Sequence, residues 1–168
     1  MNDWELFVDG VDFGEGPRWH DGRLWYSDFY QASVYAVSAD GIREVVHSNL
    51  ADRPSGLGWM PDGTLLVVSM VDRKVLKEVD GVLVEHADLS GLATWHCNDM
   101  VVDTNGNAYV GNFGFDLERG DTPCSAAIVL VRPDGSTEVA ADDVKFPNGS
   151  VITPDGRTLI VGESWGQG

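Results

Sequence analysis

Residues 54–68 read PSGLGWMPDGTLLVV, and this stretch contains the pattern that decides the fold. A short polar start leads into apolar residues, an Asp-Gly turn follows, and a second apolar run completes the pattern. An Asp-Gly pair between two short apolar runs is typical of a β-hairpin with a tight turn. The stretch therefore predicts two antiparallel strands.

The same pattern occurs four times along the chain. Its copies are residues 15–27, 54–68, 98–110 and 147–161. The turn glycines lie 41, 43 and 50 residues apart, and they are Gly22, Gly63, Gly106 and Gly156. Further hairpins lie between the copies and turn at Asp-Gly pairs, so that each repeat holds four strands. Residues 116–125 form the longest insertion and explain the wider third spacing.

A repeat of this length with four strands is typical of one blade of a β-propeller. We predict an all-β fold of the propeller type, formed by residues 1–168 as one domain. An immunoglobulin-like sandwich also contains many short strands. It does not predict the same pattern at a fixed period, so the propeller is favoured.

The 168 residues hold three full repeats and half of a fourth, or about three and a half to four blades. A propeller removes its sheet edges by closing into a ring. We therefore expect either a C-terminally truncated fragment, which we favour, or a ring that partner chains complete. An open ring would leave a blade edge exposed for self-association.

Composition excludes several classes of function. The chain has 27 acidic and 11 basic residues, a net charge of −16, so the basic footprint of a nucleic-acid binder is missing. The N-terminus lacks the pattern of a signal peptide, and no apolar run approaches the ~20 residues of a membrane span. Two cysteines do not make a disulfide framework. We expect a cytoplasmic protein with reduced thiols and no membrane or nucleic-acid partner.

Aligning the repeats on their turn glycines brings four polar residues to one position. Glu15, Ser55, Asn98 and Asn148 each precede their turn glycine by seven or eight residues. In a propeller such positions converge at one end of the central channel. A carboxylate and two amides offer the hard oxygen ligands that suit Ca²⁺ or Mg²⁺, and Mn²⁺ or Zn²⁺ can also use them. Asn residues at the start of a strand are also common turn formers, so this pattern leaves both interpretations open.

Three motifs in order carry a resemblance to a known family. Residues 15–19 read EGPRW, residues 98–103 read NDMVVD and residues 147–149 read PNG. Together they resemble the senescence marker protein / gluconolactonase / luciferin-regenerating enzyme family, which is regucalcin-like, from about Glu15 to Ser164. The resemblance implies a six-bladed propeller with one divalent metal ion in the central channel. It also implies hydrolysis of sugar lactones, with some relatives acting on phosphotriesters.

By position, the resemblance implies that Glu15 and Asn148 bind the metal ion and that Asn98 contacts substrate or a bound water. His96 stands where the family often has Arg, and it is the second residue expected to contact substrate. The family's third ligand, an Asp that also serves as the base, lies in a later Pro-Asp-Gly motif. No residue follows Gly168 in this sequence, so we expect no catalytic residue within the chain.

The sequence therefore predicts a metal-dependent hydrolase of sugar lactones that is weak or inactive as this chain alone. Ca²⁺ is the favoured ion, and Zn²⁺, Mn²⁺ and Mg²⁺ are alternatives. The competing hypothesis is a non-catalytic propeller that binds a sugar, a metal ion or a protein partner. We also expect Trp95 to form a wall of the pocket, and Asn112, Phe113 and Phe115 to lie near an opening.

Overall fold

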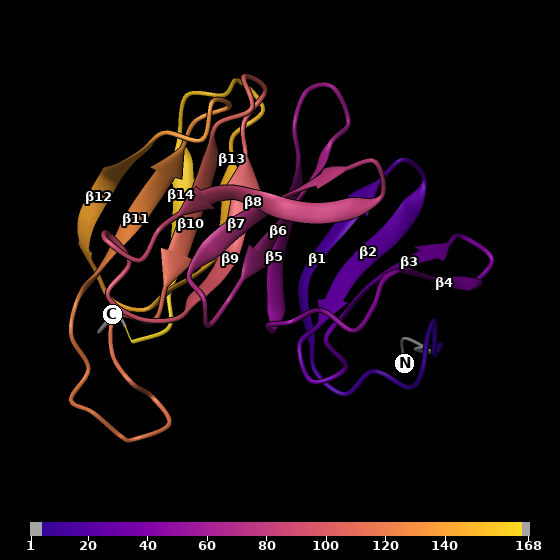
Figure 1. Ribbon diagram of the computed structural model, residues 1–168, viewed down its shortest axis with the longest axis horizontal. Helices are drawn as coiled ribbons and strands as arrows, with labels where there is room; N and C mark the ends of the chain where they lie inside the picture. The colour runs from indigo at the N-terminus through magenta and orange to yellow at the C-terminus, as the bar shows by residue number, and fades with distance from the viewer. Residues whose placement is uncertain (1–4, 166–168) are drawn as a thin grey trace.

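The computed structural model describes residues 5–165, which form fourteen β-strands and no helix (Figure 1). The strands are β1 (Gly14–His20), β2 (Arg23–Asp28), β3 (Ser33–Ser38), β4 (Arg43–His47), β5 (Pro54–Trp59), β6 (Leu65–Ser69), β7 (Lys74–Val79), β8 (Val82–Asp88), β9 (Cys97–Val102), β10 (Ala108–Asn112), β11 (Ala126–Val131), β12 (Thr137–Val144), β13 (Pro147–Ile152) and β14 (Leu159–Glu163). All pairings are antiparallel between neighbours in sequence. The sequence prediction of an all-β chain is confirmed.

The strands form three four-stranded sheets and one two-stranded sheet. We call them blade 1 (β1–β4), blade 2 (β5–β8), blade 3 (β9–β12) and blade 4 (β13–β14). The first strands of the blades pack side by side, since β5 contacts both β1 and β9, and β9 also contacts β13. Figure 1 shows the blades succeeding one another from the indigo to the yellow end of the chain. This is a partial propeller with β1, β5, β9 and β13 innermost.

Each inner strand carries the same β-bulge near its start. Two residues of the inner strand oppose one residue of its neighbour between Glu15 and Arg18 in β1, and also between Pro54 and Leu57 in β5. Bulges with the same residue count occur in β9 and β13. A bulge bends its strand and re-aims the side chains beside it. The repeated sequence pattern therefore produces a repeated distortion at the end of the strand where the polar residues lie.

Close packing of the inner strands requires a glycine in β5. A Cβ atom built on Gly56 would lie 2.5 Å from the backbone nitrogen of Met100 and 2.8 Å from the carbonyl oxygen of Asn98. Both contacts are with the backbone of β9, which cannot move away as a flexible side chain can. Gly56 therefore sets how closely blades 2 and 3 approach each other.

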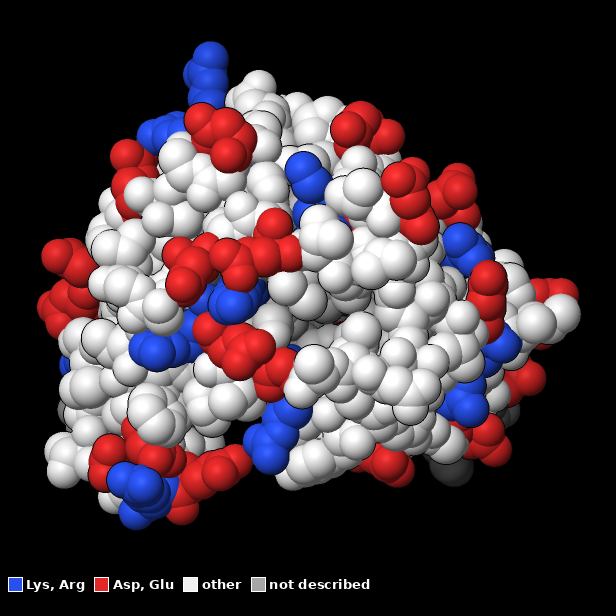
Figure 2. All heavy atoms as spheres, viewed as in Figure 1, with Lys and Arg blue, Asp and Glu red and all other residues white. Residues whose placement is uncertain are grey.

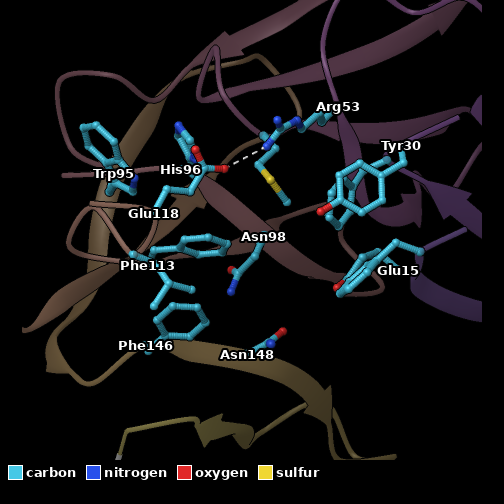
Figure 3. Close-up of a pocket in the computed structure, with 14 residues that line it drawn as sticks. Glu15, Tyr30, Arg53, Trp95, His96, Asn98, Phe113, Glu118, Phe146 and Asn148 are labelled. Carbon is cyan, nitrogen blue, oxygen red and sulfur yellow. Dashed lines mark hydrogen bonds and ion pairs between the residues drawn. The ribbon is translucent and has the colours of Figure 1, made fainter. Parts of the chain in front are cut away.

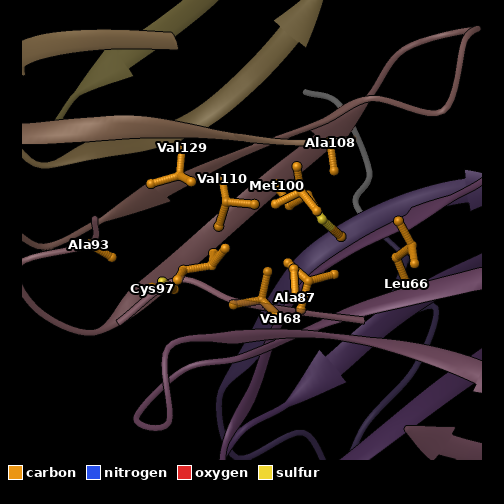
Figure 4. Packing of buried hydrophobic residues seen from close by; sticks show 12 residues of the cluster. Leu66, Val68, Ala87, Ala93, Cys97, Met100, Ala108, Val110 and Val129 are labelled. Atoms are coloured by element: carbon orange, nitrogen blue, oxygen red, sulfur yellow. The ribbon is translucent and has the colours of Figure 1, made fainter. Parts of the chain in front are cut away.

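Apolar side chains fill the space between successive blades. The largest core cluster joins blades 2 and 3 (Figure 4), and its fully buried members include Leu66, Val68, Met100 and Val110. A second cluster around Leu57 joins blades 1 and 2. Burying one such side chain contributes about 1.5–3 kcal/mol. The blades are thus held face to face by apolar packing, as in other stacked sheets.

The surface agrees with the acidic composition. On the face shown in Figure 2, Lys and Arg side chains lie beside acidic ones, so no broad basic surface forms there. Seven ion pairs link residues of opposite charge within the described part of the chain. Among residues 5–165 there is no helix of the length and hydropathy needed to cross a membrane.

We predict that Gly56→Ala destabilises the protein by about 1–3 kcal/mol, since the added methyl group must push β5 away from β9. Gly91→Ala is the matched control, because a Cβ atom on Gly91 meets nothing within 4 Å. Urea unfolding of both variants measures the difference. Equal unfolding free energies for the two variants would contradict the close approach.

Candidate functional site

A pocket of about 340 Å³ opens where the inner strands begin (Figure 3). It is lined by residues from all four blades and from the loops that connect their strands. The lining residues are Phe13, Glu15, Phe29, Tyr30, Arg53, Met70, Trp95, His96, Asn98, Phe113, Leu117, Glu118, Phe146 and Asn148. The pocket therefore brings together Glu15, His96, Asn98 and Asn148, the four residues that the sequence singled out.

The polar residues at the bottom of this pocket occupy one structural position. Glu15, Asn98 and Asn148 are each the second residue of their inner strand. Ser55 is the second residue of β5, but it is fully buried and does not line the pocket. The alignment on turn glycines thus corresponds to a true structural equivalence, which places one carboxylate and two amides around a common space.

The residues immediately before the inner strands form a second set of equivalent positions around the pocket. Phe13, Arg53, His96 and Phe146 all line the pocket. Each one accepts a backbone hydrogen bond through its carbonyl oxygen from the residue that follows the second strand of its blade. The four bonds are Phe29 to Phe13 at 3.3 Å, Met70 to Arg53 at 2.9 Å, Phe113 to His96 at 2.9 Å and Ser164 to Phe146 at 3.0 Å. The repeat therefore fixes the backbone at these four positions, while their side chains differ from blade to blade.

Sequence reasoning missed Arg53, Glu118, Tyr30 and Phe146. Arg53 donates a hydrogen bond to Glu118 across 3.2 Å, and Figure 3 shows this pair at the edge of the pocket. Glu118 belongs to the insertion that follows β10. The length of this insertion does not indicate that Glu118 contacts Arg53. Arg53 and Phe146 could have been found by reading the repeat alignment two residues before Glu15 and its equivalents.

The carboxyl group of Glu15 sits in an unfavourable environment for negative charge. Partial burial raises its pKa above the usual 4.5, and the nearby charge of Asp99 raises it further. A hydrogen bond from the backbone of Gly16 opposes these effects in part. A carboxylate at the bottom of a pocket, without a cation beside it in the described structure, is a candidate ligand for a cation.

Asn98 presents a buried amide whose oxygen is unsatisfied. Its side-chain nitrogen donates a hydrogen bond to the carbonyl oxygen of Pro147 at 2.7 Å, which links blade 3 to blade 4. The Oδ1 atom is buried and has no hydrogen-bond partner among the described residues. A Cβ atom on Gly111 would lie only 2.7 Å from this oxygen. Gly111 therefore provides the space that the amide occupies.

His96 has the character of a neutral, partly buried ring. Burial lowers its pKa below the usual 6.5, and the charge of Arg53 lowers it further, although Glu118 acts in the opposite direction. The imidazole stacks on Trp95, with ring centroids 4.9 Å apart and planes at 19°. Trp95 thus forms part of the pocket wall as expected. Of the other residues expected nearby, Phe113 lines the pocket, while Asn112 and Phe115 are buried beside it.

An ion pair between inner strands supports the site from below. The guanidinium of Arg18 on β1 donates hydrogen bonds to Asp99 Oδ1 at 2.7 Å and to the carbonyl oxygen of Met100 at 2.6 Å, both on β9. The other carboxylate oxygen of Asp99 accepts a hydrogen bond from the backbone nitrogen of Ser150 on β13. Arg18 and Asp99 therefore tie together the three inner strands that carry Glu15, Asn98 and Asn148.

The donor atoms in the pocket fit a hard divalent cation. No group of three or more His, Cys, Asp and Glu side chains suitable for a metal ion exists within residues 5–165. Any metal ion here would therefore depend on amide oxygens in addition to Glu15. The unsatisfied Oδ1 of Asn98 and the exposed amide of Asn148 can supply them. Oxygen ligands of this kind match Ca²⁺ and Mg²⁺ better than soft metals.

The chain belongs to the family described as SMP-30/Gluconolactonase/LRE-like region, whose sequence model matches residues 13–167. The resemblance found in the motifs is thereby confirmed. No curated protein matches the chain at a significant level.

Solved structures of several propellers resemble this fold. A gluconolactonase from Xanthomonas campestris has a TM-score of 0.76 and 23% sequence identity, over 94% of this chain and 57% of its own. A calcium-binding protein, regucalcin, from Agrobacterium tumefaciens has a TM-score of 0.72 and 23% identity, over 92% of this chain and 51% of its own.

A chain of a nidogen/laminin complex reaches a TM-score of 0.74 with 16% identity, over 90% of this chain and 57% of its own. The present chain therefore spans less than two thirds of the length of each of these proteins. At these identities the likeness concerns the fold, which confirms the propeller type.

We predict that Glu15→Gln stabilises the metal-free protein at pH 7. Because the folded state raises the pKa of Glu15, ionisation of this residue costs stability as pH rises above 4.5, and Gln cannot ionise. The gain should shrink as pH falls toward 4.5. Urea unfolding of both proteins in a chelator, at several pH values, measures it; a gain that is independent of pH would contradict the assignment.

We predict that Arg18→Met lowers the unfolding free energy by about 1–3 kcal/mol, because it leaves the buried Asp99 carboxylate without its cation. Arg132→Met is the matched control, since it breaks an exposed pair with Glu138 and should cost no more than about 1 kcal/mol. Thermal unfolding compares the two. A smaller loss for Arg18→Met than for the control would show that the pair does not support the inner strands.

Proposed function

We propose that the protein is a metal-dependent hydrolase of lactones, of the gluconolactonase type. The observation that carries this proposal is the convergence of Glu15, Asn98 and Asn148 in one pocket of a chain that belongs to this family. A propeller that served only as a scaffold has no need for a half-buried carboxylate next to an unsatisfied amide oxygen. Fold alone does not define the activity, so the proposal rests on this site.

In this proposal Glu15 and Asn148 hold the ion, and Asn98 lies beside it to contact substrate or a water molecule. Ca²⁺ is the favoured ion, because all three groups offer oxygen atoms. A divalent ion bound there would polarise the lactone carbonyl and stabilise the negative charge that develops on its oxygen.

His96 completes the proposed substrate contacts. It lies two residues before Asn98 and lines the same pocket. Because burial and Arg53 favour its neutral form, one ring nitrogen can accept a hydrogen bond while the other donates one. This arrangement supports a role in orienting the substrate. The expectation that the chain by itself is weak or inactive stays a prediction.

The alternative is a non-catalytic propeller that binds a sugar, a metal ion or a protein partner. Its support is the fold's likeness to a chain of a nidogen/laminin complex. The two candidates differ most in what Glu15 must do, since a propeller that binds only a sugar or a protein partner does not require its carboxylate at the bottom of the pocket. We further propose a cytoplasmic location, which the free thiols of Cys97 and Cys124 support.

We predict that the chain binds Ca²⁺ and that Glu15→Gln weakens binding by at least about tenfold, because the only carboxylate in the ligand set is lost. Calorimetric titration measures this, with Glu138→Gln as the matched control on the outer strand β12. Asn148→Ala should also weaken binding. Equal heats in all four proteins, or none in the unaltered chain, would favour the non-catalytic alternative.

A further inference from the structure

The pocket has two continuous aromatic walls. On the side of blade 1, the ring of Phe29 lies 4.5 Å from Phe13 and 4.3 Å from Tyr30. On the side of blades 3 and 4, four rings follow one another in the order Trp95, His96, Phe113 and Phe146. The distances between successive ring centroids are 4.9 Å, 6.0 Å and 4.5 Å. The candidate ligands lie below and between these walls (Figure 3).

The polar groups of the pocket are largely committed elsewhere. Glu15 and Asn148 are the candidate ligands for the metal ion, and Asn98 lies beside it and donates its amide hydrogen to Pro147. Arg53 pairs with Glu118 across 3.2 Å at the exposed edge of the pocket (Figure 3). The polar atoms left among the lining residues are the His96 ring, the Tyr30 hydroxyl and the Trp95 indole nitrogen. Since the His96 ring stacks on Trp95, only the edges of these two groups can reach a ligand.

This distribution disfavours a ligand that carries many hydroxyl groups. A hydroxyl that is buried without a hydrogen-bond partner loses its hydration and gains nothing in return. A sugar lactone would bring several hydroxyls between two aromatic walls. An alkyl or aromatic substituent would instead exchange water for apolar contact with the same walls. The volume of about 340 Å³ lies in the range of sites for small organic ligands.

We propose that the substrate is a lactone or ester with an apolar body, and that the aromatic walls determine this preference. The proposal rests on the hydrolase function proposed above and names its substrate class. In it, the carbonyl end of the ligand faces Glu15, Asn98 and Asn148, while its apolar substituent lies between the walls. At His96 the wall offers one imidazole, which has fewer hydrogen-bond donors for sugar hydroxyls than the guanidinium of an Arg would have.

Two lactams that resist hydrolysis test this preference without relying on turnover. Glucono-δ-lactam and 6-pentyl-2-piperidone share a six-membered ring and differ in hydroxyl and alkyl substituents. Calorimetric titration of the full chain with Ca²⁺ should show that the pentyl lactam binds about tenfold or more tightly than the sugar lactam. Equal affinity, tighter binding of the sugar lactam, or binding of neither would overturn the proposal.

Three variants test whether the aromatic walls cause the preference for the pentyl lactam. Phe113→Ala should weaken binding of the pentyl lactam by about two- to tenfold and leave Ca²⁺ affinity unchanged. Phe7→Ala is the matched control, because Phe7 is 43% exposed and lies outside the pocket. His96→Arg should improve binding of the sugar lactam. An unchanged lactam affinity in Phe113→Ala, with folding verified by thermal unfolding, would contradict the role of the walls.

Turnover of δ-decanolactone and glucono-δ-lactone, measured in parallel, separates the two proposals. Faster hydrolysis of δ-decanolactone supports both. Faster hydrolysis of glucono-δ-lactone supports the hydrolase and overturns the apolar substrate class. Binding of the pentyl lactam without hydrolysis of either lactone agrees with the expected inactivity of this chain by itself and supports the apolar ligand class.

Discussion

The carboxylate of Asp99 is the point on which the arrangement of the inner strands depends. It accepts a hydrogen bond from Arg18 of β1 through one oxygen and from the backbone of Ser150 of β13 through the other, while it belongs to β9 itself. At the equivalent bulge position β1, β5 and β13 carry Gly16, Gly56 and Gly149. Close backbone contact therefore joins blades 1 to 3. Blades 3 and 4 are joined by this carboxylate, by the amide of Asn98 and by the close approach of Gly111 to Pro147.

The same Asp99 carboxylate disfavours ionisation of the nearby Glu15. Its charge adds to burial in raising the pKa of Glu15, so that the metal-free pocket disfavours the ionised form of its own candidate ligand. A divalent cation beside Glu15 would reverse the unfavourable field from Asp99. Asp99 thus helps to hold the inner strands together while it adds to the cost of ionising Glu15, for which burial is the larger cause. Such a conflict is common where folding and function share residues.

The blades and the polar site residues could be predicted from the sequence because both follow from the repeat. Turn glycines fix the hairpins, and the hairpins place Glu15, Asn98 and Asn148 at the second residue of their strands. The tie between Arg18 and Asp99 could not be predicted, since it joins residues 81 positions apart whose side chains differ in each blade. The contact between Arg53 and Glu118 could not be predicted either, because the conformation of the insertion that carries Glu118 depends on tertiary contacts rather than on a local period.

The aromatic walls show how one backbone can support different chemistry. Phe13, Arg53, His96 and Phe146 share a hydrogen bond that fixes their main chain, yet they present an apolar ring, a cation, an imidazole and a second apolar ring. A substitution at one of these positions changes the pocket lining without disturbing the inner strands, because the hydrogen bond that is repeated in each blade uses only the carbonyl group. The candidate ligand position lies two residues further along the chain, directly before the bulge in β1 and within it in β9 and β13. The proposed specificity residues and the proposed metal ligands therefore occupy two neighbouring positions of the repeat, so in this proposal the substrate class can change while the candidate metal ligands stay in place.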